Sequence, residues 1–578
     1  MNFKLAMSLK ELKHRTSKKT YKGIKLLEPS SREIKKLSEN DLMVLCHLTR
    51  AARLMDDIHF KLEHPKNVDF MSFLDKEIKK GNKKAELSKK LFLSQKSMFS
   101  PDNLGNQTKL VSGISVPPGL NYFPEDLTTE EFHEILNDML DSGKVDEVGR
   151  ILNQRSVVVR NGNELKAIDF VDAFDEFKQM ANELKKAREY SDDKKFNKYL
   201  ELQIKALEKA DPELDAKADK EWAKLDNNKF EFTITRECYD EKMTSSISEN
   251  EELLARLKDA GIKAYAKDSL GVRVGIVNRS GTRLLRKLKG LIDVARKVMP
   301  YKDECETETE KQSVSQTAVD VDLVTLTGEE GAYQAGIVVA QNLPNDDKLA
   351  LKLGGGRRNV YHRQIRKRSN KKLYKNLISE EFFKYYNPEA DHWAVICHEN
   401  THSLGAKSHG SLGKFSAIIE EFKADMGMYA FLDEFVQAGC FSENQAKQIM
   451  VTSLSKSFGK GMPDIKQDHR VRSVMICTRM IADRGIIFNE AGKLTFNFEQ
   501  IKKSARKMIA EAIRLQLDAN VSGAKEYIEK WFVWTDELKN VAEIIKTHSK
   551  ALNGYLITPL ADEFVKQNFD PKNILAAK

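Results

Sequence analysis

The chain contains few cysteines, and none of them is arranged as a pair. Six cysteines are scattered over 578 residues without any C-x-x-C spacing. This usage favours free, buried thiols in a reducing compartment over a disulfide framework.

Long hydrophobic runs are also missing. No stretch of about 18 apolar residues occurs in the chain, so no membrane span is expected. The first residues, Met1–Met7, contain no apolar segment long enough for a secretory signal. The sequence therefore predicts a cytoplasmic protein without a membrane partner.

An excess of one charge is nearly absent. Lys and Arg total 95 against 86 Asp and Glu, a net charge of +9 that is small for this length. The charge balance therefore does not indicate a nucleic-acid partner. Two local basic clusters, at 79–84 and 363–372, are expected to be solvated surface. The alternative is a basic patch for an acidic partner or a peptide carboxylate.

Histidine is scarce, with 12 in the chain, yet two of them stand in one H-E-x-x-H pattern. His398 and His402 lie one helical turn apart, so both imidazoles can reach the same ion, and Glu399 directly follows the first of them. Two nitrogen ligands, an open coordination position and a carboxylate base form the arrangement of a zinc hydrolase. In this interpretation Zn²⁺ is the cofactor and Glu399 is the general base.

A second helical segment, 416–426, offers the third ligand. Glu421 lies 19 residues after His402, beyond a Gly/Ser loop, and His-His-Glu is a standard ligand set of catalytic zinc. Asp425, one turn further on, could accept the second ring N–H of a ligand histidine and so fix its tautomer. The alternative is a pair of amphipathic helices with a solvated acidic face.

The pattern of elements predicts an α+β protein with more than one core. A chain of this length, 41% hydrophobic and 31% charged, is typical of a globular protein of two or more domains. We expect a mixed lobe with a small β-barrel-like sheet at 1–280, to which 313–365 and about 548–578 return. We expect a helical, zinc-binding lobe at 366–547, with 281–312. A cleft between the two lobes would be the default substrate site.

Local signals give the expected elements in more detail. A capping pattern at 38–41 opens a helix, and another helix is expected at 129–142. Residues 1–40 are basic and polar and are expected to be ordered only in part. Further expectations are a strand ending in an Asn161–Gly162 turn, strands at 229–235, 272–277, 318–326 and 335–340, and a nearly all-helical region from about 373 to 550.

Several segments resemble the dipeptidyl peptidase III family of zinc peptidases, in particular its shorter bacterial members. Residues 420–425 read E-E-F-K-A-D and resemble the family motif E-E-C-R-A-E, whose second Glu binds zinc. The resemblance thus assigns the ligand role to Glu421 and leaves Glu420 as a supporting residue. Residues 51–57 and 118–128 also look like these bacterial members, and the resemblance runs through most of the chain from about residue 40.

The resemblance also implies residues that contact the substrate. Asn342 and Asn345 stand in an N-L-P-N segment similar to the N-I-P-N segment that holds the substrate's N-terminal end. Their alternative role is turn formation, which Asn favours. His469 resembles a downstream histidine that assists the transition state, and it is otherwise a surface residue beside a basic helix.

The chain departs from the family pattern at two points. The best-known members have H-E-x-x-G-H, whereas this chain has the ordinary H-E-x-x-H spacing of some bacterial members. The family also has an acidic residue two places before an active-site tyrosine. Tyr265 is the candidate for that tyrosine, with Lys263 at the position of the acidic residue, so recognition of the substrate's free amine is expected to differ.

The leading functional hypothesis is a zinc exopeptidase that acts on short peptides and releases N-terminal dipeptides. The alternatives are an aminopeptidase or broader zinc hydrolase, and a non-catalytic zinc-binding scaffold. Glu399 argues against the scaffold, because a purely structural metal needs no base. Some family relatives carry a Nudix domain, but no G-x5-E-x7-R-E stretch occurs here. The oligomeric state stays open.

Overall fold

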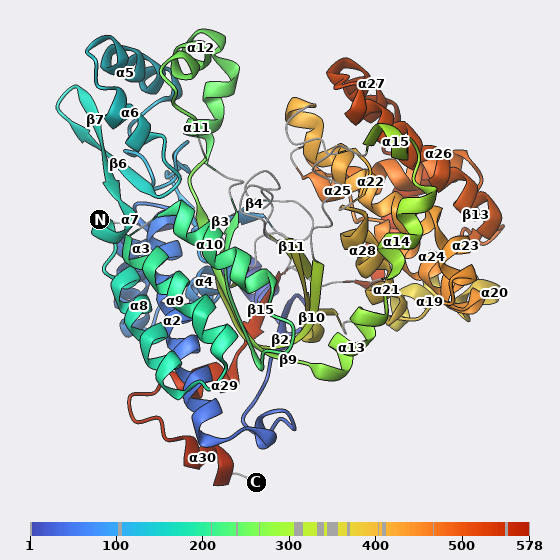
Figure 1. Ribbon diagram of the computed structural model, residues 1–578, viewed down its shortest axis with the longest axis horizontal. Coiled ribbons are helices and arrows are strands. Elements are labelled where there is room, and N and C mark those ends of the chain that lie inside the picture. Colours follow the sequence, from blue (N-terminus) through green and yellow to red (C-terminus); the bar gives the residue numbers. More distant parts are fainter. Residues whose placement is uncertain are drawn as a thin grey trace. The chain divides into compact units, whose positions relative to one another are not determined.

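The computed structural model describes most of the chain and divides into two units. Unit 1 comprises 1–277, 321–338 and 551–578, and unit 2 comprises 278–320 and 339–550 (Figure 1). The described residues are 3–101, 107–209, 211–237, 241–264, 266–288, 290–305, 316–331, 340–343, 357–366, 370–402, 404–406, 412–465, 467–549 and 553–576.

A layer of long helices forms one part of unit 1. Helix α2 (Glu39–Glu63) begins at a capping box in which Ser38 and Asp41 bond each other's backbone N–H, which confirms the predicted start. It packs against α8 (Glu176–Tyr190), which packs against α9 (Lys194–Lys209), and α9 packs against α10 (Pro212–Ala223). The buried face of α2 is almost continuous from Leu42 to Leu62, so this helix contributes to the core of the unit along most of its length.

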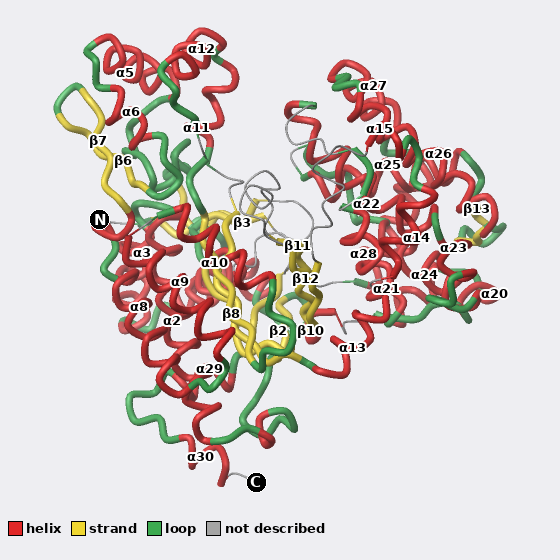
Figure 2. Tube along the Cα trace, in the orientation of Figure 1, coloured by secondary structure: helices red, strands yellow, loops and turns green. Residues whose placement is uncertain are grey.

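A five-stranded sheet includes β8, β9 and most of β10 from unit 1, and α2 is in contact with β9 (Figure 2). Its strand order is β11-β12-β10-β9-β8. In the part of the chain that the structure describes, the sheet is open, with β11 and β8 at its edges, so the expected barrel-like form fits it only loosely. Its strands are β8 (Phe230–Glu237), β9 (Ser269–Val277), β10 (Gln316–Gly328), β11 (Ala340–Leu343) and β12 (Arg357–His362).

The described residues of the N-terminal segment form defined elements, in a stretch that was expected to be ordered only in part. Strand β1 (Lys4–Leu5), helix α1 (Leu9–Arg15) and strand β2 (Tyr21–Lys25) form there. Four side chains of the segment are buried in one cluster: Phe3, Met7, Leu12 and Tyr21. Strand β2 pairs in parallel with β15 (Asn553–Ile557), more than 500 residues away in the sequence. The apolar residues of this segment are too sparse to form a helical or strand periodicity. They are buried by residues that lie far away in the sequence.

Unit 2 is mainly helical, as predicted. Helix α22 (Ser416–Ala430) packs against α21 (Ala390–Thr401), α25 (Asp468–Ala482) and α26 (Phe498–Leu517), and α24 (Glu443–Ser457) packs against α21. A short hairpin, β13 (Ile486–Phe488) with β14 (Leu494–Phe496), interrupts the helices. The predicted α+β class, with a mixed unit and a mainly helical unit, is thereby confirmed. Among the described helices, none combines the length and the apolar character needed to cross a membrane.

Candidate metal centre

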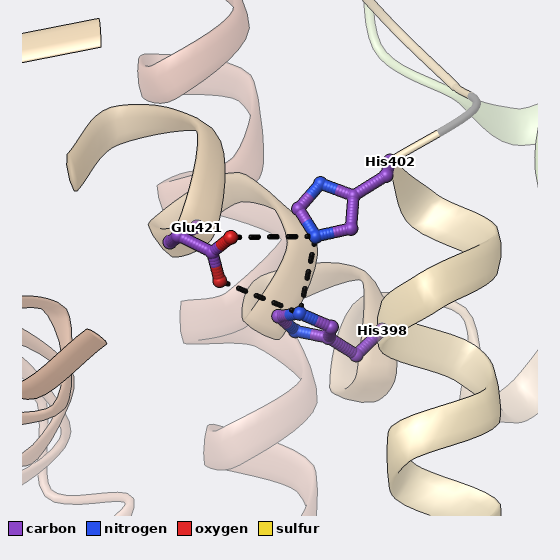
Figure 3. A group of neighbouring side chains, drawn as sticks. All are labelled: His398, His402 and Glu421. Atoms are coloured by element: carbon purple, nitrogen blue, oxygen red, sulfur yellow. Dashed lines mark hydrogen bonds and ion pairs between the residues drawn. The ribbon is translucent and has the colours of Figure 1, made fainter. Parts of the chain in front are cut away.

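Helices α21 and α22 bring together three side chains that could hold one metal ion. His398 and His402 lie one turn apart at the end of α21, and Glu421 faces them from α22 (Figure 3). The two Nε2 atoms are 3.1 Å apart. The Glu421 carboxylate places Oε2 3.4 Å from His398 Nε2 and Oε1 3.6 Å from His402 Nε2. Two atoms bound at about 2.1 Å to one tetrahedral zinc ion are about 3.4 Å apart, so these separations suit a shared ion.

The other ring nitrogens determine what the two Nε2 atoms can do. His398 Nδ1 lies 2.8 Å from Asp425 Oδ1, and His402 Nδ1 lies 3.0 Å from Glu420 Oε1. An ionised carboxylate only accepts hydrogen bonds, so each Nδ1 carries the proton and donates it. In the neutral imidazoles both Nε2 atoms then present lone pairs toward each other and toward Glu421, a donor set that fits a cation and not a hydrogen bond.

Buried cations hold the two supporting carboxylates. Lys423 Nζ lies 2.9 Å from Glu420 Oε1 and also donates to the carbonyl oxygens of Leu404 and Ala406. Burial raises the pKa of Glu420, but Lys423 and His402 outweigh burial and lower that pKa to about 2. Glu420 is therefore charged at neutral pH, and it is fixed in position behind the His402 ring.

Asp425 is held in a similar way by Arg472 of α25. The guanidinium forms an ion pair with Asp425 Oδ2, and its Nε lies 3.8 Å from Glu421 Oε2. Burial raises the pKa of Asp425, and Arg472 and His398 lower it to below its ordinary value. One carboxylate oxygen thus receives the imidazole N–H and the other faces the arginine.

The carboxylates around the imidazoles create a strongly negative site. Burial lowers the pKa of His402, but Glu421, Glu420 and Glu399 outweigh burial and raise it above its ordinary value. Burial raises the pKa of Glu421, and the histidines around it lower it to well below its ordinary value. A position that stabilises added positive charge in this way suits a divalent cation. Glu399 itself is 8% exposed, next to His398 on α21.

The arrangement of the three candidate ligands requires a close approach between α21 and α22. Gly427 lies on α22 opposite Thr401 of α21, and a Cβ at position 427 would overlap the Thr401 side chain. Thr401 Oγ1 in turn donates to the carbonyl oxygen of Cys397 at 2.7 Å. Glycine thus allows α22 to lie near enough for Glu421 to face the histidines.

Of the remaining predicted site residues, the structure brings one to the centre, and the side chains of the others lie outside the described part. His469, at the start of α25, lies beside the centre, with Nδ1 3.0 Å from Glu421 Oε2 and its side chain 68% exposed. The negative charge of Glu421 raises the pKa of His469 above its ordinary value. Asn342 lies in β11 opposite Asn359 of β12, and its side chain is outside the described part. Tyr265 and Asn345 also lie outside the described residues.

Sequence reasoning missed three residues that support the centre. Arg472 stands three places after His469, a helical spacing that puts both on one face and could have indicated it. Lys423 stands three places after Glu420 and carries the same signal. Gln516 of α26 donates to Glu420 Oε2 at 2.9 Å, and no local signal points to a residue this far along the chain.

A second stretch of the sequence carries the tyrosine spacing of the family. An acidic residue two places before a tyrosine occurs at Glu237–Tyr239, directly at the end of β8. This spacing is the one that the resemblance requires, and the stretch around Tyr265 lacks it. Residues 238–240 lie outside the described part of the chain.

Comparison with solved structures places the fold among the dipeptidyl peptidase III structures. The dipeptidyl peptidase III of Caldithrix abyssi matches with a TM-score of 0.79 at 21% identity, covering 96% of this chain and 100% of that one. The enzyme of Corallococcus sp. strain EGB matches with a TM-score of 0.77 at 17% identity, covering 98% and 99%. At these identities the likeness shows a shared fold.

A comparison by sequence gives a similarly low identity. "Nudix hydrolase 3" of Arabidopsis thaliana is 22% identical over 583 residues, which covers 92% of this chain and 72% of that protein. No family model matches the chain.

Proposed function

We propose that this protein is a zinc-dependent peptidase that hydrolyses short peptides and releases dipeptides from their N-termini. The observation that carries the proposal is the set of Nε2 and carboxylate atoms of His398, His402 and Glu421, which lie within 4.8 Å of one another. The likeness of the whole fold to two dipeptidyl peptidase III structures supports the same reaction. A cytoplasmic location stays a prediction.

The chain's own residues divide the work of the reaction. His398, His402 and Glu421 would hold the zinc ion, and Asp425 and Glu420 would keep the two imidazoles in the tautomer that binds it. When bound, zinc supplies Lewis acidity, which polarises a carbonyl group and lowers the pKa of a water ligand.

Glu399 is the proposed general base. Its place directly after His398 on α21, its burial and the effect of its charge on His402 support this role. It takes the proton of the attacking water and passes it to the leaving amine. His469 is the proposed donor to the oxyanion that develops on the scissile carbonyl, and its high exposure leaves its ring accessible to a substrate.

Recognition of the substrate's N-terminal end is proposed for two asparagines and one acidic residue. Asn342 and Asn345 would bind the peptide backbone through their side-chain amides. Tyr265 stays a proposed active-site tyrosine, and Tyr239 is the alternative, because Glu237 stands two places before it as the family spacing requires, whereas Lys263 stands before Tyr265. We therefore propose that Glu237 binds the free amine.

Two matched variants test the amine-binding residue. Glu237→Gln should raise KM for dipeptidyl substrates by about tenfold or more, because a charged hydrogen bond to the amine is lost. Lys263→Gln should leave KM unchanged. The reverse result would return the assignment to the stretch around Tyr265.

The reaction itself is tested by mass spectrometry of the products from a defined set of peptides of three to ten residues. The expected products are N-terminal dipeptides, lost after treatment with a chelator and restored by added zinc. N-terminal acetylation of the same peptides should prevent cleavage. Release of single residues would indicate an aminopeptidase instead. Absence of cleavage by the zinc-loaded protein would indicate the scaffold and contradict the proposal.

A further inference from the structure

A second group of potential metal ligands lies in unit 1, far in sequence from the candidate centre. His59 and Glu63 lie one turn apart near the end of α2, and Glu329 opens the short helix η3 (Glu329–Gly331), directly after β10. His59 Nε2 lies 3.8 Å from Glu63 Oε1 and 3.8 Å from Glu329 Oε2. The three side chains therefore surround one point.

The state of His59 is the second observation. The residue is 2% exposed, and within the described part of the chain neither of its ring nitrogens has a hydrogen-bond partner. A buried polar group without a partner typically costs about 1–3 kcal/mol. A buried imidazole that faces two carboxylates beyond hydrogen-bonding distance therefore needs an explanation.

The surrounding backbone holds the three groups in place. Gly328 adopts φ +58, and a Cβ there would overlap the carbonyl oxygen of Leu270, so the turn into η3 requires glycine. The Gly328 N–H donates to Asp56 Oδ1 of α2 at 2.8 Å. Ser269 Oγ donates to Glu329 Oε2 at 3.3 Å. The turn is thus tied to the helix beside the cluster.

We propose that His59, Glu63 and Glu329 form a second binding site for a divalent transition-metal ion, with Zn²⁺ as the best fit, and that this ion joins α2 to the β10–η3 turn. One imidazole with two carboxylates is a mixed donor set that suits zinc. Ligand atoms at about 2.1 Å from one ion lie roughly 3.4 to 4.2 Å apart, depending on the angle, and the separations of 3.8 Å fall in this range.

A direct ion pair explains the same geometry less well. A protonated imidazole paired with a carboxylate brings nitrogen and oxygen to about 2.7–2.9 Å. His47, on the same helix, shows that arrangement, with Nδ1 2.8 Å from Glu183 Oε2. The distances at His59 are about 1 Å longer on both sides, which leaves room for an ion between the groups.

The test is made in a chain whose first centre has been removed, so that its outcome does not depend on the proposed peptidase activity. The His398→Ala/His402→Ala variant is dialysed against Zn²⁺, then against metal-free buffer, and its zinc content is measured by mass spectrometry. The expected content is one zinc per chain. Adding His59→Ala should reduce it to none, whereas adding His47→Ala, the matched change at a buried His–Glu pair of α2, should leave it at one.

Conservative variants keep the test valid if His59→Ala does not fold. Glu63→Gln and Glu329→Gln preserve side-chain volume and should each weaken zinc binding by at least about 100-fold in the same background. Zinc should also raise the unfolding temperature of the background variant by about 5 °C, but not that of its His59→Ala form. If the background variant binds no zinc, or if Glu329→Gln binds it as tightly, the proposal is overturned.

Discussion

At the scale of single residues, a change at Glu399 should separate metal binding from catalysis. Glu399→Gln keeps the shape of the side chain but cannot take a proton, so peptide turnover should fall by about 10²–10⁴-fold. The zinc content should not change, because none of the three proposed ligands is altered. The measurement combines kcat on a dipeptidyl amide with metal analysis of the same sample.

Glu389→Gln is the control for this change, because Glu389 is an exposed carboxylate at the start of the same helix. It should leave both quantities as they are. Full turnover in Glu399→Gln would show that another group acts as the base.

Asp425 should act through His398 and not on the substrate. Asp425→Asn removes the charge that holds the Nδ1 proton and leaves the buried Arg472 with Glu421 as its remaining carboxylate neighbour. The concentration of zinc that restores half of the activity to the metal-free enzyme should rise by about 10–100-fold. At saturating zinc kcat should stay near that of the unchanged protein. Asp391 lies on α21 like His398, but its carboxylate pairs with Lys456 of α24. Asp391→Asn should therefore change neither the zinc concentration nor kcat.

The sequence was informative at the residues whose spacing lies within one helix. His398 and His402, and Glu421 and Asp425, each stand four places apart, so a helical reading puts each pair on one face. The contacts between different helices could not be predicted from such spacings. Arg472 and Gln516 reach the centre because α25 and α26 pack on α22, and no local pattern encodes which helices become neighbours.

At the scale of elements, the approach of α21 to α22 depends on Gly427. Replacing glycine by alanine inside a helix usually stabilises it by about 0.5–1 kcal/mol. Here the added Cβ would overlap Thr401, and overpacking of this kind costs about 1–3 kcal/mol. The second effect is larger, so Gly427→Ala should lower the free energy of unfolding measured in urea and should weaken zinc binding.

A matched glycine and a double variant define this prediction further. Gly149, in α6 (Val145–Ile151), has open space around it, so Gly149→Ala should be neutral or stabilising. Combining Gly427→Ala with Thr401→Ala should be less harmful than the sum of the two single changes. Simple additivity would mean that the two side chains do not meet.

The hydrogen-bonded pair of His47 on α2 and Glu183 on α8 should make the stability of unit 1 depend on pH in the acidic range. Burial raises the pKa of Glu183, but hydrogen bonds from His47 and Lys186 outweigh burial and lower it to about 2. A carboxylate whose folded pKa is depressed stabilises the protein above its unfolded pKa of about 4.5, and this stabilisation is lost as the pH falls toward 2.

Glu183→Gln should therefore cost about 1–2 kcal/mol at pH 6, after allowance for solvent screening of this partly exposed group. The difference from the unchanged protein should shrink between pH 4.5 and pH 2. Glu189→Gln, an exposed change on the same helix, should show no such dependence on pH. A difference that stays constant with pH would contradict the assignment to Glu183.

Elements were predictable where the signal is short-ranged. The capping box of α2, the N-cap Thr128 of α5 (Thr129–Asp141) and the turn at Gly162 between β6 (Ser156–Asn161) and β7 (Glu164–Asp169) all follow from neighbouring residues. The hairpin of β13 and β14 was missed, because strands of three residues carry too little alternation to stand out among helices.

At the scale of the whole molecule, the chain order does not follow the units. Unit 1 is assembled from three separate stretches and unit 2 from two. Returns of this kind were expected at 313–365 and about 548–578 for the mixed lobe and at 281–312 for the helical lobe. The domain boundaries drawn from the sequence stay a prediction.

The last stretch of the chain should be essential for unit 1. Strand β15 pairs with β2, and the rings of Tyr555 and Tyr21 stack with their centroids 4.3 Å apart. Helix α29 (Pro559–Phe564) buries Leu560 and Phe564, and Arg50 of α2 donates to the carbonyl oxygen of Phe564 at 3.0 Å. Burial of two such side chains alone contributes about 3–6 kcal/mol.

Ending the chain after residue 550 should therefore lower the unfolding temperature of unit 1 by several degrees and should increase hydrogen exchange in β2. Ending it after residue 570 removes only α30 (Pro571–Ala576), whose buried side chain is Ile574, and should have a much smaller effect. The proposed zinc centre of α21 and α22 should persist in both shortened chains, because unit 2 contributes all its proposed ligands. If hydrogen exchange in β2 is unchanged in the chain that ends after residue 550, the pairing of β2 with β15 does not stabilise the N-terminal segment.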